Sequence, residues 1–470
     1  MTNFFELGLT QTEKEIQLDS IPVEGKIPLW LKGTLIRNGP GTFNVGKSSY
    51  RHWFDGLAML HKFSFNTGKV SYSNKFLECD AYKEAMEKGK ISYSEFATDP
   101  CRSLFGKLTA VFNQKITDSA KVNVAQIGER FLALGETPLQ IEFDPVTLES
   151  LGVYKYEEKY NQHITTVHPQ FDFKSGEIYN LVTRFNRISH YRIKRLLNGR
   201  SELAAEIPVK EPAYIHSFGM SEKYLILTEY PLVVNPLKLL FQIKPFIENF
   251  VWKPENGARF LIFEKKSGEL AAEIKTDAFF AFHHINAFDD GEELVIDINA
   301  YPDAEIIRAF YLNRLKDKKS RLPFGEFRRY HLNLASGNVR YEKISDECIE
   351  LARYDYERLN MNKDYRYVYG VSVNKKEPEG FYNQLVKIDI HNKKSKNWFS
   401  ENCYPGEPVF AGNPGRTDED DGVVLSVVLN EKKGNSFLLI LDAASFTEIA
   451  RAEIPHPVLF GYHGEFFDQI

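Results

Sequence analysis

The feature that most constrains this chain is a hairpin pattern that recurs seven times. Each copy has a strand with alternating apolar and polar residues, a short turn, and a second such strand, which is the signature of a β-hairpin. The copies begin at Leu60, Leu139, His190, Phe260, Arg328, Leu385 and Phe437. Their starts lie 51 to 79 residues apart. Each interval therefore has room for two further strands and a loop.

Four strands per repeat, arranged radially seven times, make a β-propeller, which leaves only short and protected sheet edges. The pattern predicts an all-β fold, a seven-bladed β-propeller, with 1–470 as a single domain because no linker or low-complexity tract divides it. The repeat exceeds the roughly 40–45 residues of WD-repeat blades. We expect the extra residues in long loops on one face, where functional groups concentrate. A pair of β-sandwiches or two stacked sheet domains is the alternative.

Charge and composition narrow the functional classes. The formal net charge is -5, which gives no argument for nucleic-acid binding. The cysteines form no CxxC pair, which is typical of a reducing compartment. The first residues lack the apolar run of a signal peptide, and no stretch of about 18 uncharged apolar residues could span a membrane. These observations predict a cytoplasmic protein.

Four of the 12 histidines stand in similar places, in the segment that follows a hairpin. They are His168, His216, His283 and His463. In a propeller that segment is typically the innermost strand of the next blade, so the four side chains would converge on the axis. Neutral imidazoles bind Fe, Zn, Cu or Ni, and the lack of accompanying cysteines favours a redox metal over structural zinc. A single strand histidine is more often an ordinary core or surface residue, so it is the repetition that predicts a metal site.

Three glutamates in apolar strand contexts are candidate partners for these imidazoles: Glu136, Glu350 and Glu407. A metal-bound imidazole usually donates its other N–H to a carboxylate or a carbonyl. Three anions would also offset the charge of a metal held by neutral ligands. The alternative is that they are ordinary glutamates at strand ends.

Nine motifs occur in a fixed order along the chain. They read GTLIRNGPGTF, RHWFDGLAMLHKF, ITDSAKVNV, TTVHPQFD, YIHSFGMSE, FHHINAFDDGEELVIDI, DYRYVYG, GEPVFAGNPG and EDDGVVLSVVLN. With these motifs the chain, from about Gly25 to Phe467, resembles the carotenoid cleavage oxygenases, which include the retinal isomerohydrolase of the eye and the β-carotene oxygenases. Leu57 stands where the family commonly has Asp. Ala352 and Asp355 stand where it usually has Pro and Asn, which weakens the match of Glu350.

The resemblance implies a propeller with a helical and loop cap over the iron-containing face. It implies an Fe(2+) ion whose ligands are His168, His216, His283 and His463. It also implies that three glutamates are partners of these histidines: Glu136, Glu350 and Glu407. The implied reaction adds O2 across a double bond of a carotenoid or apocarotenoid and gives two carbonyl products. Phe96 and Tyr301 are candidates to face the polyene with their π systems, although strand aromatics are more often core residues.

Three alternative functions are open at this point. The first is isomerohydrolysis of a retinyl ester, which uses the same iron site. The second is cleavage of stilbenes or phenylpropanoids, a branch with a Lys before the glutamate matched by Glu136, where this chain has Gly135. The third is a non-enzymatic propeller that binds proteins.

Two segments, 99–115 and 236–253, combine apolar and aromatic residues with lysines or arginines. That composition is typical of segments that lie in the plane of a membrane interface. Both match by position the apolar patch around the tunnel mouth in animal-like members of the family. We therefore expect a peripherally membrane-associated protein. Two buried helices packed on the propeller are the alternative.

Overall fold

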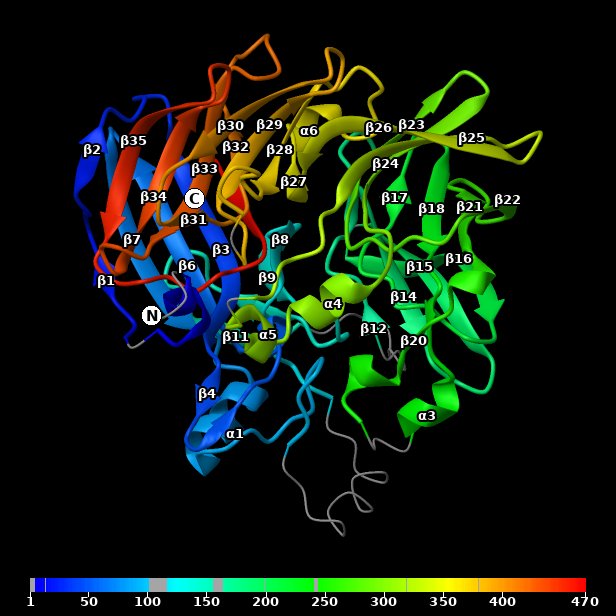
Figure 1. The fold of residues 1–470 in the computed structure, drawn as a ribbon, viewed down its shortest axis with the longest axis horizontal. Helices are drawn as coiled ribbons and strands as arrows, with labels where there is room; N and C mark the ends of the chain where they lie inside the picture. The colour runs from blue at the N-terminus through cyan, green and yellow to red at the C-terminus, as the bar shows by residue number, and fades with distance from the viewer. Residues whose placement is uncertain are drawn as a thin grey trace.

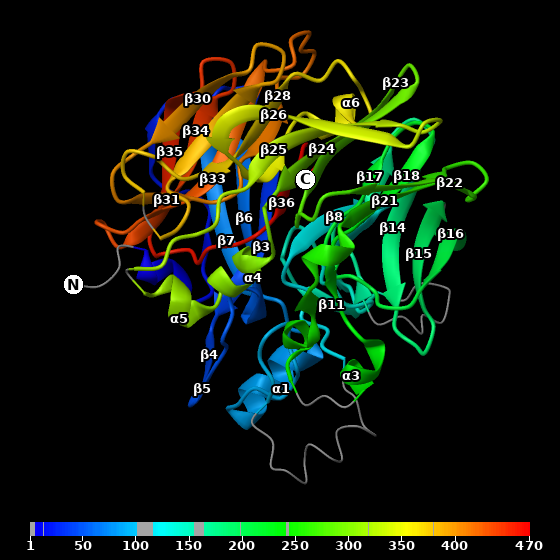
Figure 2. The ribbon, with the colours of Figure 1, turned by 45° about the vertical axis from the view of Figure 1, so that its right-hand side comes forward.

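The structure, a computed structural model, describes residues 5–12, 14–100, 116–154, 164–197, 199–240, 244–317, 319–378 and 380–470. Seven antiparallel sheets of four or more strands form a ring (Figure 1, Figure 2). This is the predicted seven-bladed β-propeller, and the two-sandwich alternative is excluded.

The first three blades have the following strands in order from the axis outward. Blade 1 is β36 (Gly464–Phe467), β3 (Gly33–Thr42), β6 (Leu57–Asn66), β7 (Lys69–Phe76) and β1 (Gln17–Leu18). Blade 2 is β8 (Asn123–Ile127), β9 (Arg130–Leu134), β10 (Ile141–Phe143) and β11 (Ser150–Val153). Blade 3 is β12 (Ile164–Thr165) with β13 (Gln170–Asp172), then β14 (Glu177–Arg184), β15 (Ser189–Leu197) and β16 (Arg200–Val209).

The remaining four blades follow in chain order. Blade 4 is β17 (Gly219–Met220), β18 (Tyr224–Glu229), β21 (Ala258–Glu264) and β22 (Leu270–Thr276), and blade 5 is β23 (His284–Asp290), β24 (Glu293–Ala300), β25 (Glu326–Asn333) and β26 (Asn338–Cys348). Blade 6 is β27 (Glu350–Arg353), β28 (Tyr367–Ser372), β29 (Gln384–Asp389) and β30 (Lys394–Phe399). Blade 7 is β31 (Cys403–Pro405) with β32 (Val409–Gly412), then β33 (Gly422–Asn430), β34 (Asn435–Asp442), β35 (Thr447–Ile454) and β2 (Val23–Gly25).

All seven predicted hairpins are present, and they supply the outer strands of the blades. They are β6–β7, β10–β11, β15–β16, β21–β22, β25–β26, β29–β30 and β34–β35. Strands nearer the axis, such as β3 and β33, are buried on both faces because neighbouring blades cover them, and the sequence of β33 is accordingly a nearly continuous apolar run. The outer strands β26 and β30 are largely exposed.

Both chain termini close the ring. The C-terminal strand β36 pairs antiparallel with β3, with Thr34 opposite Phe467 and Arg37 opposite Gly464. It thereby becomes the innermost strand of a blade whose other strands come from the N-terminal part of the chain. At the outer edge of blade 7, the N-terminal strand β2 pairs with β35. Closure of this kind leaves no long unpaired edge at the junction between the two ends.

The cap over one face of the ring is built from loops and short helices rather than long helices. The α-helices described are α1 (Asp80–Lys88), α3 (Pro236–Leu240), α4 (Glu305–Ala309), α5 (Leu312–Leu315) and α6 (Tyr356–Leu359). The 3-10 helices are η1 (Glu6–Leu9), η2 (Trp53–Asp55), η3 (Phe246–Asn249) and η4 (Pro254–Asn256), and two small ribbons pair β4 (Asn44–Val45) with β5 (Ser48–Ser49) and β19 (Leu232–Val233) with β20 (Val251–Trp252). Both ribbon views show α1 and α3 below the blades, and Figure 1 shows them on opposite sides of the molecule.

The two segments predicted to lie on a membrane are only partly described. Residues 101–115 lie outside the described residues. The second segment is not one amphipathic helix: among its described residues it comprises α3, η3 and β20, with Ile247 and Phe250 buried in the core. None of the helices in the described parts of the chain has the length and apolar character needed to cross a bilayer.

Ring closure predicts an unequal response to two glycine substitutions. Gly33 has φ +122°, and a Cβ added there would lie 2.5 Å from the carbonyl oxygen of Phe467 in β36. Gly337, in the β25–β26 turn, has φ +73° and open space around the same position. Both alanine variants bear the left-handed backbone cost of roughly 1–2 kcal/mol. Gly33→Ala should lower the free energy of unfolding by a further ~2 kcal/mol, because packed atoms must move apart.

Chemical denaturation followed by circular dichroism measures this difference, with Gly337→Ala as the matched control. Equal losses of stability in the two variants would show that the β3–β36 junction is not tightly packed.

Candidate metal centre

The four histidines lie at the inner ends of four blades. His216, His283 and His463 stand just before the innermost strands β17, β23 and β36, and His168 lies in the break between β12 and β13. A position at a strand end, rather than within a ladder, leaves each side chain free to turn toward the axis. The expectation that the four side chains converge is confirmed by their geometry.

The imidazole nitrogens are close enough to share one ion. The Nε2 atoms of His168 and His216 are 3.1 Å apart, and those of His283 and His463 are 3.2 Å apart. One ligand atom from each of the four lies within 4.8 Å of all the others. Two imidazole nitrogens at a usual metal–nitrogen distance of roughly 2 Å lie about 3 Å apart, so these separations suit coordination. The cluster fits a metal site.

Three of the four imidazoles are oriented by glutamates through their second ring nitrogen. His216 Nδ1 lies 2.7 Å from Glu136 Oε1, His463 Nδ1 lies 2.8 Å from Glu407 Oε1, and His283 Nδ1 bonds to Glu350 Oε1. An N–H donated to a carboxylate fixes the tautomer, so that Nε2 carries a lone pair for a metal. Within the described residues, His168 has no such glutamate partner.

Each blade contributes one of these seven residues. The histidines come from blades 1, 3, 4 and 5, and Glu136, Glu350 and Glu407 come from blades 2, 6 and 7. Every histidine–glutamate hydrogen bond therefore joins two different blades. The centre is a property of the whole ring.

The charges around the glutamates are compensated. Glu407, fully buried, forms an ion pair with the buried Arg37 and accepts the backbone N–H of Gly464 at 3.0 Å. Glu350 accepts from the Tyr301 hydroxyl and the Asn299 amide as well as from His283. Although burial opposes ionisation, these contacts lower the pKa of Glu350. The carboxylate of Glu350 can therefore stay ionised in its buried site.

Three of the four histidines are held in the neutral form by their surroundings. Burial lowers the pKa of His168 and of His463 well below the ordinary value, and nearby histidines act in the same direction. Burial also lowers the pKa of His216, against the opposing effect of Glu136. A metal ligand must be the neutral imidazole, so the environment favours the form that binds.

His284 occupies a different environment from its neighbour. Its Nδ1 lies 2.9 Å from Ser217 Oγ and its Nε2 lies 2.8 Å from Thr228 Oγ1, so both ring nitrogens are used within the wall of the propeller. Burial lowers the pKa of His284 to about 3. Strand alternation thus turns His283 toward the axis and His284 away from it, as predicted from the sequence.

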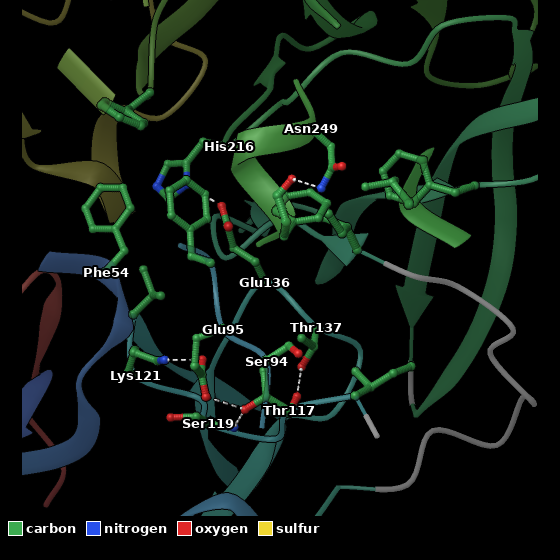
Figure 3. A pocket seen from close by; sticks show the side chains of 18 of the residues that line it. Phe54, Ser94, Glu95, Thr117, Ser119, Lys121, Glu136, Thr137, His216 and Asn249 are labelled. Atoms are coloured by element: carbon green, nitrogen blue, oxygen red, sulfur yellow. Dashed lines mark hydrogen bonds and ion pairs between the residues drawn. The ribbon is translucent and has the colours of Figure 1, made fainter. Parts of the chain in front are cut away.

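A cavity of about 480 Å³ leads outward from the histidines. Its inner wall includes His216, His283 and His463, and its outer part includes Leu237 and Phe246. Figure 3 shows His216 and Glu136 at one side of the cavity, with a group of polar side chains across from them. The lining is mostly apolar, which suits a long hydrocarbon substrate.

The two aromatic residues predicted to meet a substrate have different positions. Phe96 lines the cavity, with its ring 5.4 Å from that of Phe54 and 6.3 Å from that of Phe246. Tyr301 is buried, is not among the lining residues, and its hydroxyl donates to Glu350. The structure thus places Tyr301 against Glu350 rather than in the cavity lining, and contact of its ring with a substrate stays a prediction.

Sequence reasoning missed other residues of the cavity and the centre. Phe54, Phe282 and Phe310 form an aromatic cluster in the wall, with ring centroids 5.5 to 6.2 Å apart, and Phe282 lies edge-on to His216. Tyr214 donates its hydroxyl to Glu136 at 2.7 Å. The three phenylalanines come from separate segments of the chain that share no sequence pattern. Arg37 could have been found from the sequence, because it is a charged residue that directly follows the apolar residues Leu35 and Ile36.

Comparison with known proteins agrees with this geometry. The family model described as retinal pigment epithelial membrane protein matches residues 9–468. The chain is 33% identical to the β,β-carotene 15,15'-dioxygenase of Rattus norvegicus, covering 96% of this chain and 90% of that protein. It is 32% identical to the chloroplastic carotenoid cleavage dioxygenase 8 of Arabidopsis thaliana, covering 97% and 84%.

A solved structure is similar over almost the full length. The cobalt-substituted apocarotenoid oxygenase of Synechocystis superposes with a TM-score of 0.88 at 25% identity, covering 99% of this chain and 98% of that one. The fold, the four-histidine cluster and the family match agree with one another, and this chain belongs to the retinal pigment epithelial membrane protein family, the carotenoid cleavage oxygenases.

Proposed function

We propose that this protein is an Fe(2+)-dependent oxygenase that cleaves a double bond of a carotenoid or apocarotenoid with O2 and releases two carbonyl products. The observation that carries the proposal is the convergence of four imidazoles, three of which line the inner end of a mostly apolar cavity. His168, His216, His283 and His463 would hold the ion. A ferrous ion held by these four nitrogen ligands would supply reactivity toward O2.

The side chains around the ion have separate tasks. Glu136, Glu350 and Glu407 orient three imidazoles and supply negative charge close to the cation. Phe54, Phe282 and Phe310 line the inner cavity, exclude water and present ring surfaces to a polyene. Aromatic faces stabilise positive charge that develops along a polyene, and Phe96 extends this wall outward.

Two other reactions are less well supported. The β-carotene and carotenoid cleavage relatives named above are dioxygenases, which favours oxidative cleavage over isomerohydrolysis of a retinyl ester. A stilbene- or phenylpropanoid-cleaving enzyme would need a lysine at Gly135. A Cβ at that position would already lie 3.1 Å from the Cα of Ala120 and 3.2 Å from the carbonyl oxygen of Ser119.

A membrane surface is the proposed source of the substrate. Carotenoids dissolve in lipid, and exposed apolar side chains surround the outer part of the cavity: Ile116 (41% exposed) and Leu237 (51%) line it, and Ile188 (59%) follows the lining residue Arg187. The lysine Lys244 also lines this region. Apolar side chains with basic neighbours are suited to a peripheral contact with a bilayer.

The first test measures metal content and turnover together. The purified protein should contain about one iron per chain by elemental analysis and should bleach β-carotene or an apocarotenal with formation of aldehydes. His283→Ala should lose both iron and activity, whereas His284→Ala should keep the metal, because its ring contacts Ser217 and Thr228 instead. Active protein with stoichiometric zinc and no iron would contradict the proposal.

The second test separates the role of a glutamate in orienting an imidazole from its role in the stability of the protein. Glu136 is the most exposed of the three glutamates and is not part of an ion pair with a lysine or arginine among the described residues. Glu136→Gln should therefore lower kcat/KM by roughly 10–100-fold without a change in melting temperature. Glu407→Gln should also lower the melting temperature, because it leaves the buried Arg37 without its partner. Full activity of both variants would remove the glutamates from the mechanism.

The third test concerns the membrane. Phe246 packs inside the cavity wall, so substitutions there would confound lipid binding with folding. The triple variant Ile116→Ser, Ile188→Ser and Leu237→Ser should release the protein from liposomes in a flotation assay and slow cleavage of liposomal substrate, while detergent-dispersed substrate is still cleaved.

The matched control for that experiment changes three equally exposed residues on outer strands, Leu151→Ser, Leu203→Ser and Leu270→Ser. Equal flotation of wild type and both triple variants would show that the cavity rim does not contact lipid.

A further inference from the structure

A group of polar side chains interrupts the apolar lining of the cavity. Glu95, Thr117, Ser119 and Lys121 all line it, and we call them the polar wall. Figure 3 shows them gathered on the side of the cavity across from His216 and Glu136. None of them belongs to the metal centre described above, so their presence in a cavity for a hydrocarbon chain needs its own explanation.

The polar wall contains a buried ion pair. Lys121 Nζ lies 2.6 Å from Glu95 Oε2, and the two side chains are only 5% and 3% exposed. The Thr117 hydroxyl donates to Glu95 Oε1 at 2.8 Å, and Lys121 also donates to the carbonyl oxygen of Asp55 at 3.2 Å. Burying such a pair usually gives no more stability than apolar residues of the same volume. Stability alone therefore does not account for it.

The polar wall also has unused hydrogen-bonding capacity. The Ser119 Oγ atom is buried and has no hydrogen-bond partner among the described residues. Among the described residues, Lys121 uses two of its three donors, and the Glu95 carboxylate accepts two bonds although it can accept about four. A buried hydroxyl without a partner is unfavourable, and a ligand atom that reaches it removes that cost. The unused groups include donors and acceptors.

The polar wall extends from Thr117, which follows the rim residue Ile116, to Lys121, whose neighbour in the chain contacts the metal centre. Lys121 directly precedes Val122, whose carbonyl oxygen accepts the backbone N–H of His463 at 3.1 Å. The backbone of Ser119 and Ala120 packs against Gly135, next to Glu136. A ligand atom held by Ser119 and Lys121 would therefore be close to the part of the substrate that reaches the histidines.

From this arrangement we infer that the polar wall binds an oxygen atom of the substrate, so that the enzyme selects polyenes with a hydroxyl or carbonyl group over pure hydrocarbons. The inference rests on the proposed function and specifies its substrate class. A carbonyl oxygen of the substrate can only accept hydrogen bonds, so its binding depends on the donors Lys121 and Ser119. A hydroxyl group of the substrate can also donate a hydrogen bond, so its binding additionally uses the carboxylate of Glu95.

The test compares three polyenes of equal length: an apocarotenal, the alcohol obtained from it by reduction, and the hydrocarbon with a methyl group in place of the oxygenated carbon. Wild-type kcat/KM should be roughly 10–100-fold lower for the hydrocarbon, which is what hydrogen bonds to charged groups contribute. In the double variant Glu95→Gln with Lys121→Met, which removes both members of the ion pair, the ratio of kcat/KM between the oxygenated polyenes and the hydrocarbon should fall to about threefold or less. Ser119→Ala should reduce the ratio about fivefold.

A second buried pair provides the matched control. Lys265 and Asp172, 2.7 Å apart, lie outside the cavity lining, and Lys265→Met with Asp172→Asn should leave the wild-type ratio in place. Wild-type enzyme that cleaves all three polyenes equally, or a double variant of the polar wall that keeps the full preference, would overturn the inference.

Binding measurements keep this result separate from the proposed function. Quenching of tryptophan fluorescence, to which Trp53 in the cavity wall contributes, gives dissociation constants for the same three polyenes without turnover. If iron-loaded protein cleaves no polyene but still binds the apocarotenal more tightly than the hydrocarbon, the proposed reaction is wrong. The inference that the polar wall binds a substrate oxygen is then supported. Equal dissociation constants of the wild-type protein for the three polyenes would contradict the inference about the polar wall, whatever the activity.

Discussion

The rest of the structure depends on the pairing of β36 with β3, which joins the two ends of the chain. His463 directly precedes β36, so the hydrogen bonds that close the ring also place one of the four imidazoles. Glu407 accepts from the side chain of His463 and from the backbone N–H of Gly464, the first residue of β36. Architecture and site are therefore fixed by the same few contacts.

Charge balance explains why so many ionised groups can be buried at the centre of an otherwise apolar ring. Glu136, Glu350 and Glu407 are three anions close to four neutral histidines, and Arg37 is a cation paired with one of them. A divalent ion at the histidines would bring the formal charge of this group to zero. Without such compensation, the cost of desolvating three carboxylates would be several kcal/mol for each ion.

Much of this organisation could be predicted from the sequence, for identifiable physical reasons. Outer hairpins alternate in polarity because one face is more exposed, so all seven were visible, and the histidines were visible because they repeat at equivalent positions. The placement of Tyr301 was not predictable, because β24 ends at Ala300 and strand alternation no longer fixes the side chain. Phe54, Phe282 and Phe310 come together only through tertiary structure. The ion pair of the polar wall joins residues 26 positions apart, with no local pattern.

The order in which the chain is synthesised gives the radial site a further consequence. The histidines from blades 3, 4 and 5 emerge from the ribosome well before His463 and the residues of β36, which follow them in the chain. Until those residues are released, β3 lacks its inner neighbour and the fourth imidazole is absent. A nascent chain that has not yet reached β36 therefore has an incomplete set of ligands, and the four-histidine cluster can form only after the ring has closed.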